Sequence, residues 1–229
     1  MMINFNLNAS LFKYSQIRRN SYFEMILVKC IDVYKVIINS AVQLSNDENK
    51  IRDEFLKYLQ NLDFKKKYDL KHLKFDEETK ENAGRADIRI LPTKDEYVND
   101  DAYYIIECKR LDSRNTSGTT GLNAEYVKNG ICRFASDYYT SYYSCNAMFG
   151  FIVEPVDVQI DIVDNINSML DIDYVNAQKV NVNANIIQQM RYEDFANKYP
   201  YSYISKHKCN SGKELSLYHL MFDFSQNIQ

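Results

Sequence analysis

Two apolar, strand-like segments that carry acidic residues constrain the fold of this chain most strongly. Residues 84–90 hold Asp87 among small and β-branched residues, and residues 103–111 hold Glu107 and Lys109 directly after a run of Tyr and Ile. Burying an unpaired charge costs several kcal/mol, so charged side chains persist in such segments only when they pair or bind an ion. These segments therefore predict a sheet that holds a cluster of charges.

The two segments are predicted to pair as an antiparallel hairpin. The polar residues 92–101 separate them, and a turn centred near Tyr97 sets Asp87 opposite Glu107. Because side chains alternate between the two faces of a strand, Glu107 and Lys109 share one face of the sheet. The two acids and the lysine are therefore expected to meet.

Two amphipathic helices are predicted before these strands. In residues 21–44 apolar side chains recur at steps of three and four, which is typical of a helix with one buried face. The residues before this helix are expected to form a loose arm or a short extra helix. Ser45 followed by Glu48 matches a capping box, so a second helix is predicted over residues 45–62.

The central part of the chain is predicted to alternate strands with one more helix. An unbroken apolar run in the last of these strands is typical of a strand buried on both faces. From the second helix onward the predicted order is helix, strand, strand, strand, helix, strand. We expect strands over residues 66–75, 85–91, 102–111 and 147–153, and a helix over residues 122–141 after a Gly/Ser/Thr-rich loop at 113–121.

The last third of the chain carries weaker signals. Residues 158–170 are predicted as a helix, and residues 186–198 are predicted to contain another. Residues 201–207 and 214–224 are predicted as a hairpin that turns at residues 210–212, which read Asn-Ser-Gly.

Length and composition suit one compact domain with extensions. The chain has 229 residues, of which 45% are hydrophobic and 26% charged, and its three Pro and six Gly mark no flexible linker. We divide it into an N-terminal helical extension (residues 1–44), a core (residues 45–155) and a C-terminal extension packed on the core (residues 156–229).

The charge of the chain limits the kinds of partner it suits. A net charge of −3 excludes a strongly basic, sequence-independent nucleic-acid binder. A local basic groove stays open, because Lys and Arg residues crowd the same third of the chain as the acid pair. For the Lys run at residues 65–67 the simpler interpretation is a solvated face.

The Cys and His residues mark no metal or disulfide motif. The five Cys residues are widely spaced and form no CxxC pair, so they are expected to be reduced thiols in the cytoplasm. His207 and His219 have no identifiable partners and are interpreted as structural or surface histidines. Charged residues interrupt the most apolar stretch, residues 25–41, and no signal-peptide pattern is seen, so secretion and membrane spanning are disfavoured.

Two acids and a lysine that converge on adjacent strands suit the hydrolysis of a phosphodiester. Asp87 and Glu107 are hard oxygen ligands of the kind that Mg²⁺ prefers, and the Cys108 backbone carbonyl lies between Glu107 and Lys109. Lys109 is then placed to activate the attacking water or to stabilise the pentacovalent phosphate. Mn²⁺ is expected to substitute for Mg²⁺.

The pattern D-x(19)-E-x-K, with Asp87, Glu107 and Lys109 on consecutive strands, resembles the PD-(D/E)xK or restriction-endonuclease-like nuclease superfamily. The resemblance covers residues 45–154 and implies an αβββαβ core, which matches the order predicted from periodicity. Ala86 stands where the name of the motif has proline. The resemblance implies a Mg²⁺-dependent endonuclease that cuts DNA, of the kind found in prokaryotic defence and restriction.

Further site residues follow from the resemblance and from helical spacing. Many members add a glutamate from the helix before the first strand, and Glu48 and Glu54 both stay candidates, since a capping box alone also explains Glu48. Tyr126 and Arg133, seven residues apart, are expected to project from one helix face toward the scissile phosphate, although helix packing also accounts for Tyr126. Arg110 is a further candidate for substrate binding.

The chain shows no separate recognition domain. Specificity is therefore expected to come from the terminal extensions, a homodimer or a partner subunit of a defence system. Two alternatives stay open. One is a catalytically inactive scaffold of the same fold that binds nucleic acid or protein; the other is an unrelated domain with Glu107 and Lys109 on the exposed face of an edge hairpin.

Overall fold

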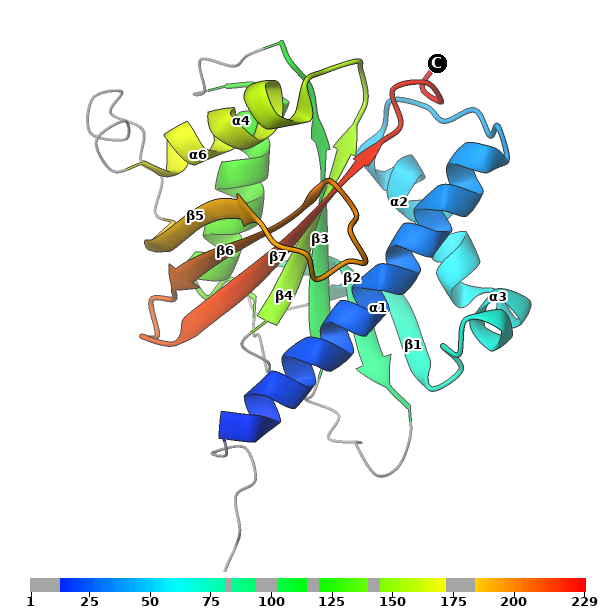
Figure 1. Cartoon of the computed structure of the whole chain (residues 1–229), viewed down its shortest axis with the longest axis horizontal. Coiled ribbons are helices and arrows are strands. Elements are labelled where there is room, and N and C mark those ends of the chain that lie inside the picture. The colour runs from blue at the N-terminus through cyan, green and yellow to red at the C-terminus, as the bar shows by residue number, and fades with distance from the viewer. Residues whose placement is uncertain (1–12, 81–83, 94–102, 115–119, 140–144, 172–183) are drawn as a thin grey trace, which may run out of the picture.

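The computed structural model describes residues 13–80, 84–93, 103–114, 120–139, 145–171 and 184–229. Within these ranges the chain forms a seven-stranded sheet with helices on both faces, which confirms the predicted mixed α and β class (Figure 1). The strands are β1 Leu73–Lys80, β2 Arg85–Pro92, β3 Tyr104–Leu111, β4 Cys145–Ile152, β5 Ile186–Tyr192, β6 Ser202–Lys208 and β7 Glu214–Asp223. The helices are α1 Lys13–Asn39, α2 Glu48–Gln60, α3 Leu62–Lys67, α4 Leu122–Tyr126, α5 Cys132–Ala135 and α6 Asn165–Leu170, with the π-helical segments η3 Val127–Ile131 and η4 Val158–Asp164.

The sheet combines a parallel centre with antiparallel edges. Its strand order is β1-β2-β3-β4-β7-β6-β5, in which β3, β4 and β7 are parallel and the remaining neighbours are antiparallel. Parallel neighbours need a crossover, and the helical segment from α4 to α5 makes it between β3 and β4. Every residue of the central strand β4 is buried, as its unbroken apolar sequence predicts.

Helices bury both faces of the sheet in two apolar layers. On one face α1 and α2 pack on an aromatic cluster that includes Phe55, Phe149 and Phe222. On the other face α4, η3, η4 and α6 pack around Met148 and Met221. Each fully buried Phe side chain stabilises such a layer by about 2 kcal/mol relative to an exposed one.

Strand β3 lies between the two layers and carries its charges on one face. Cys108 belongs to the first layer, whereas Ile105 and Leu111 belong to the second. Glu107 and Lys109 alternate with Cys108 and therefore lie on the second face, as predicted.

The start of α2 differs from the predicted capping box. The N-cap residue is Asp47, whose side chain accepts a hydrogen bond from the Lys50 amide at 3.0 Å. Glu48 is consequently the first residue of the helix, and the assignment of Ser45 as N-cap is wrong. The carboxylate of Glu48 is thus available for contacts outside the helix.

The region between α2 and the first strand also differs from the prediction. The helix predicted over residues 45–62 ends early, because the Asn61 side chain caps a new short helix, α3. That helix occupies the start of the strand predicted over residues 66–75, and β1 begins only at Leu73.

Two helix predictions further along the chain need correction. The predicted helix over residues 186–198 is wrong, because its first part is the edge strand β5, which pairs with β6. The Asn167 amide bonds both the N–H and the carbonyl of Met190, and this contact helps to hold β5 extended. The helix predicted over residues 122–141 ends at Ala135 and includes the π turn η3.

Other predictions hold. The C-terminal hairpin is present as the antiparallel pair β6 and β7, and residues 158–170 are helical throughout. The turn predicted near Tyr97 lies outside the described residues. The C-terminal strands continue the sheet that β1 to β4 begin, and a bridge between Leu44 and Ile228 ties the chain before α2 to the C-terminal segment.

All five cysteines are free thiols, as expected from their spacing. None of the helices in the described ranges combines the length and apolar character that crossing a bilayer requires. The His207 and His219 rings both lie in the interior rather than at the surface.

Candidate active site

The site begins where β2 and β3 separate. The two strands pair over a short stretch that ends at Ile106, in the register predicted from the sequence. Beyond it, the Cys108 amide donates to Asp87 Oδ2 at 2.8 Å, and the Arg110 amide donates to Glu48 Oε2 at 3.1 Å. At this point β2 no longer pairs with β3, so the two carboxylates accept the hydrogen bonds of these β3 amides in its place. These bonds hold both acids beside β3.

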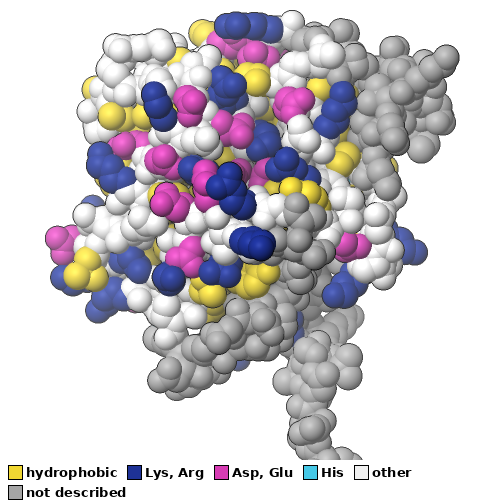
Figure 2. Space-filling view, turned by 180° about the vertical axis from the view of Figure 1, so that it is seen from behind, with side chains coloured by type: hydrophobic (Ala, Val, Ile, Leu, Met, Phe, Trp, Pro, Cys, Tyr) yellow, Lys and Arg dark blue, Asp and Glu magenta, His cyan; other side chains and the backbone are white. Residues whose placement is uncertain are grey.

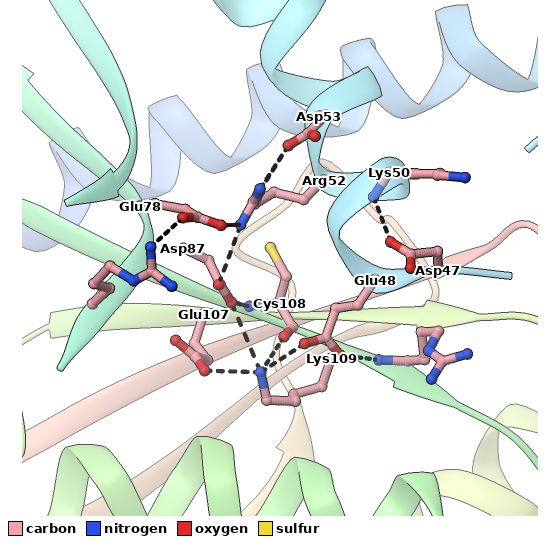
Figure 3. Close-up of polar contacts among 12 residues, drawn as sticks. Asp47, Glu48, Lys50, Arg52, Asp53, Glu78, Asp87, Glu107, Cys108 and Lys109 are labelled. Carbon is pink, nitrogen blue, oxygen red and sulfur yellow. Dashed lines mark hydrogen bonds and ion pairs between the residues drawn. The ribbon is translucent and has the colours of Figure 1, made fainter. Parts of the chain in front are cut away.

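The Lys109 ammonium lies at the centre of the site (Figure 3). Its Nζ lies 2.8 Å from Glu107 Oε1, 3.0 Å from Glu48 Oε1, 2.7 Å from the Cys108 carbonyl oxygen and 3.8 Å from Asp87 Oδ2. An ammonium group has three protons to donate, and these match the three oxygen atoms within hydrogen-bond distance; Asp87 Oδ2 lies farther away and interacts through its charge. We call the three carboxylates, the Cys108 carbonyl and the ammonium the Lys109 cluster.

The cluster reaches from the interior of the protein to solvent. The Glu107 side chain is 1% exposed, whereas the side chains of Asp87 and Glu48 are 18% and 30% exposed. A cation or a phosphate group would therefore approach from the side of Asp87 and Glu48.

Burial and charge shift the pKa values of the two most enclosed groups. Burial raises the pKa of Glu107 to about 7, and the negative charge of Asp87 adds to the rise, while Lys109 and Tyr139 oppose it. Burial acts to lower the pKa of Lys109, but the charges of Glu107, Asp87 and Glu48 outweigh it and raise that pKa above its ordinary value. Lys109 is thus a cation at neutral pH.

Arg52 extends the charge network toward β1. Its guanidinium, 4% exposed, lies 2.7 Å from Asp53, 3.3 Å from Glu78 and 3.6 Å from Asp87. Glu78 pairs in turn with Arg85 at 2.6 Å. Charges of alternating sign therefore run from β1 and β2 into the site and hold the Asp87 carboxylate in place (Figure 3).

The structure brings together the residues that carry the sequence motif. Both acids, the lysine and the carbonyl between Glu107 and Lys109 lie in the Lys109 cluster. Of the two candidate glutamates, Glu48 joins the cluster, whereas Glu54 pairs with Lys57 at 3.1 Å on the same helix. The Arg110 guanidinium donates to the Asn46 carbonyl at 2.9 Å.

Tyr126 and Arg133 do not share one helix face, so that prediction is wrong. Tyr126 is fully buried and its hydroxyl bonds His219 Nδ1 at 2.8 Å, whereas Arg133 donates to Glu107 Oε1 at 3.0 Å. The π turn η3 lies between them and has more residues per turn than an α-helix, which changes their angular spacing. Arg133 therefore contacts the Lys109 cluster, and Tyr126 belongs to the core.

No protein-family model, curated protein or solved structure matches this chain. The chemistry that the Lys109 cluster can support therefore follows from its own atoms. Its donors are carboxylate and carbonyl oxygens, and these surround a single cationic nitrogen.

These oxygens suit a hard divalent cation. Mg²⁺ binds through one or two carboxylates and keeps several waters, and Mn²⁺ accepts the same ligands. In the part of the chain that the structure describes, no three His, Cys, Asp or Glu side chains are grouped to hold a metal ion by themselves. The Cys108 carbonyl and waters would therefore share the coordination with Asp87 and Glu107.

Sequence reasoning missed two residues of the site, Arg52 and Tyr139. Arg52 lies four residues after Glu48 and so on the same face of α2, a spacing that can mark it as a partner of the cluster. Tyr139 follows α5 and donates to Glu107 Oε2 at 2.5 Å. Its distance along the chain from Glu107 matches no motif, so no sequence signal points to it.

Proposed function

We propose that this chain is a metal-dependent nuclease that hydrolyses DNA phosphodiester bonds, with a core of the restriction-endonuclease-like kind. One observation carries the proposal: three carboxylates and a backbone carbonyl converge on Lys109 Nζ where β2 and β3 separate. Perturbed pKa values beside a specific charge partner favour a functional over a purely structural cluster. The element order from α2 to β4 also matches the order that such a core requires, apart from the short extra helix α3.

In this proposal the acids of the cluster hold the cation. Asp87, Glu107 and the Cys108 carbonyl would be its ligands, and Glu48 would bind it or an attached water. When bound, Mg²⁺ supplies a more acidic water and neutralises charge on the phosphate. Arg52 keeps the Asp87 carboxylate oriented toward the site.

The hydrolysis itself exchanges one phosphorus–oxygen bond for another. The water oxygen bonds to phosphorus and loses a proton, while the bond from phosphorus to a deoxyribose oxygen breaks and that oxygen gains a proton. The products are a phosphate monoester and a free hydroxyl. The Lys109 ammonium lies among the same carboxylates, and there it would stabilise the negative charge of the pentacovalent phosphate.

Binding of DNA would depend on a local surface or on a second subunit. Figure 2 shows basic and acidic side chains interspersed on the rear face of the molecule, which suits the net charge of −3. DNA affinity that rests on few phosphate contacts falls only gently with salt, because the slope grows with the number of contacts. A homodimer, or a partner subunit of a prokaryotic defence system, would supply the remaining contacts and allow cleavage of both strands.

Plasmid cleavage tests the proposal. Supercoiled plasmid is incubated with the wild-type protein and Mg²⁺ or Mn²⁺, beside Asp87→Ala and Lys109→Ala, with EDTA as the metal-free control. Glu54→Gln is the control for loss of a carboxylate outside the cluster, because Glu54 pairs with Lys57 on α2. Metal-dependent cleavage that both Ala variants lose and Glu54→Gln keeps would support the proposal. No cleavage with either metal, or cleavage that survives both Ala variants, would overturn it; binding of DNA without cleavage favours the inactive scaffold.

A further inference from the structure

The buried carboxylate of Glu107 is held differently at its two oxygens. Oε1 points into the Lys109 cluster, where it lies 2.8 Å from Lys109 Nζ and 3.0 Å from Arg133 Nη1. Oε2 points away from the lysine and accepts a hydrogen bond from the Tyr139 hydroxyl at 2.5 Å. The orientation of the carboxylate plane is therefore set from both ends.

The Tyr139 hydroxyl is itself fixed. Its ring is 2% exposed and packs against Phe134 and Tyr138, with ring centroids 4.9 and 5.2 Å apart. Arg133 Nη1 donates to the hydroxyl oxygen at 3.4 Å, and a guanidinium only donates. The single hydroxyl proton of Tyr139 is consequently free to go to Glu107 Oε2.

Arg133 cannot replace this contact. Its guanidinium is 32% exposed and bonds the same oxygen of Glu107 as Lys109 does, which leaves the rotation of the carboxylate open. Among the described residues, the Tyr139 hydroxyl is the hydrogen-bond donor to Oε2. Rotation of Glu107 about this end would turn Oε1 away from the cluster.

We propose that Tyr139 is a positioning residue of the cation site: its hydroxyl holds Glu107 so that Oε1 is presented to a divalent cation. This inference rests on the proposed function, because it takes the cluster to be a site for a divalent cation. Partners that orient a metal ligand commonly contribute roughly tenfold or more to metal affinity. Loss of the Tyr139 hydroxyl should accordingly weaken metal binding more than it lowers the stability of the fold.

The test uses Mn²⁺ as the probe and the full chain. Binding of Mn²⁺ is measured by the loss of the free-ion electron paramagnetic resonance signal for wild type, Tyr139→Phe and Tyr138→Phe. The Phe variant at 139 keeps the ring that packs on Phe134. The Phe variant at 138 removes a hydroxyl from the adjacent ring, which packs on Tyr139 and lies under the Arg133 guanidinium. Plasmid cleavage is measured over a range of Mg²⁺ concentrations for the same proteins, and thermal unfolding shows that each is folded at the assay temperature.

For Tyr139→Phe we expect a dissociation constant for Mn²⁺ raised roughly tenfold and a matching rise in the Mg²⁺ concentration for half-maximal cleavage. High Mg²⁺ should restore most of the rate, which a loss of folding would not allow. Tyr138→Phe should stay within about twofold of wild type in both measurements, well under the tenfold effect.

Two results would overturn the inference in distinguishable ways. In the first, wild type binds Mn²⁺ and cleaves DNA, and Tyr139→Phe does both with the same metal dependence. Tyr139 then does not orient Glu107 for the cation, while the proposed function stands. If wild type neither binds Mn²⁺ nor cleaves, the inference fails together with the proposed function.

Discussion

Two groups of polar side chains lie beside the same sheet, and they differ in charge and in exposure to solvent. The Lys109 cluster holds ionised groups of both signs and opens to solvent at Asp87 and Glu48. The other group is wholly buried and contains no ionised side chain. We call it the histidine chain; it links Tyr126, His219, Ser205 and His207 by hydrogen bonds.

Each proton of the histidine chain has one assigned position. The Ala184 carbonyl only accepts, so His207 donates through Nδ1 at 2.7 Å, and its Nε2 accepts from Ser205 at 2.7 Å. The Ser205 oxygen then accepts from His219 Nε2 at 2.8 Å, and Tyr126 donates to His219 Nδ1 at 2.8 Å. Burial lowers the pKa of His207 to about 4 and that of His219 well below its ordinary value, so both rings stay neutral.

The comparison contrasts a group that is complete without a ligand with a group whose oxygens could accept a cation. In the histidine chain every donor meets one acceptor, so the group is complete without a ligand. In the Lys109 cluster three carboxylates meet at one ammonium, and burial raises the pKa of Glu107 to about 7. Converging carboxylate oxygens at a solvent-reachable position are what a site for a hard cation requires.

The largest effect is expected from Lys109→Met, which removes the cation at the centre of the cluster. Three carboxylates lose their shared partner, and breaking such a buried pairing costs about 3–5 kcal/mol of unfolding free energy. Cleavage should be lost as well. Urea unfolding with and without Mg²⁺ checks this, and Mg²⁺ should recover part of the lost stability because it can occupy the same oxygens. A variant as stable as wild type in metal-free buffer would contradict our account of the cluster.

Ser205→Ala should break the histidine chain without touching the cluster. It leaves His207 Nε2 without a donor and His219 Nε2 without an acceptor, at a cost of about 2–4 kcal/mol of unfolding free energy for the two groups. The metal dependence of cleavage should stay that of wild type for the folded protein. Ser216→Ala, at a half-buried position on β7, is the matched control for urea unfolding. A changed metal dependence in Ser205→Ala would show that the two groups are coupled.

Acid should destabilise the protein through the histidine chain. The folded-state pKa of His207 is lowered to about 4, so its contribution is fully present above its ordinary pKa of 6.5 and is lost as the pH falls through 4. From pH 7 to pH 5 this group alone lowers the free energy of unfolding by about 2 kcal/mol. Urea unfolding of wild type and His207→Gln at both pH values checks it. An equal drop in both proteins would assign the acid sensitivity to other groups.

The smallest effect is expected from Gly130→Ala in the π turn. The added Cβ would lie 2.3 Å from Met148 Cε and 3.8 Å from Lys109 Cγ, so only the flexible end of Met148 must move. Alanine also favours the helical backbone by about 1 kcal/mol, which offsets that movement. Thermal unfolding and plasmid cleavage should both stay close to wild type. A large loss of cleavage would show that the position of the Lys109 stem is more tightly constrained than its contacts indicate.

Local patterns predicted most of the sheet and the centre of the site. The alternation of side chains placed Glu107 and Lys109 on one face, and the hairpin register followed from a polar turn between two apolar strands. The unbroken apolar run of β4 predicted a buried central strand. Each of these depends on residues that are near in sequence or on the period of a single element.

What could not be predicted depends on contacts between distant segments. Residues 186–192 form a strand because β6 and Asn167 supply partners for their backbone groups. The π turn that separates Tyr126 from Arg133 lies in a sequence that reads as a continuous α-helix. Tyr139 reaches Glu107 only because the chain turns back after α5.

A crystal of the protein soaked in Mn²⁺ tests the central claim most directly, through the anomalous scattering of the ion. We predict a peak within coordination distance of Asp87, Glu107 and the Cys108 carbonyl, with the Lys109 ammonium displaced from the centre of the cluster. No peak at saturating Mn²⁺, with Lys109 Nζ still bound to Glu48 and Glu107, would contradict the claim that this cluster is a cation site.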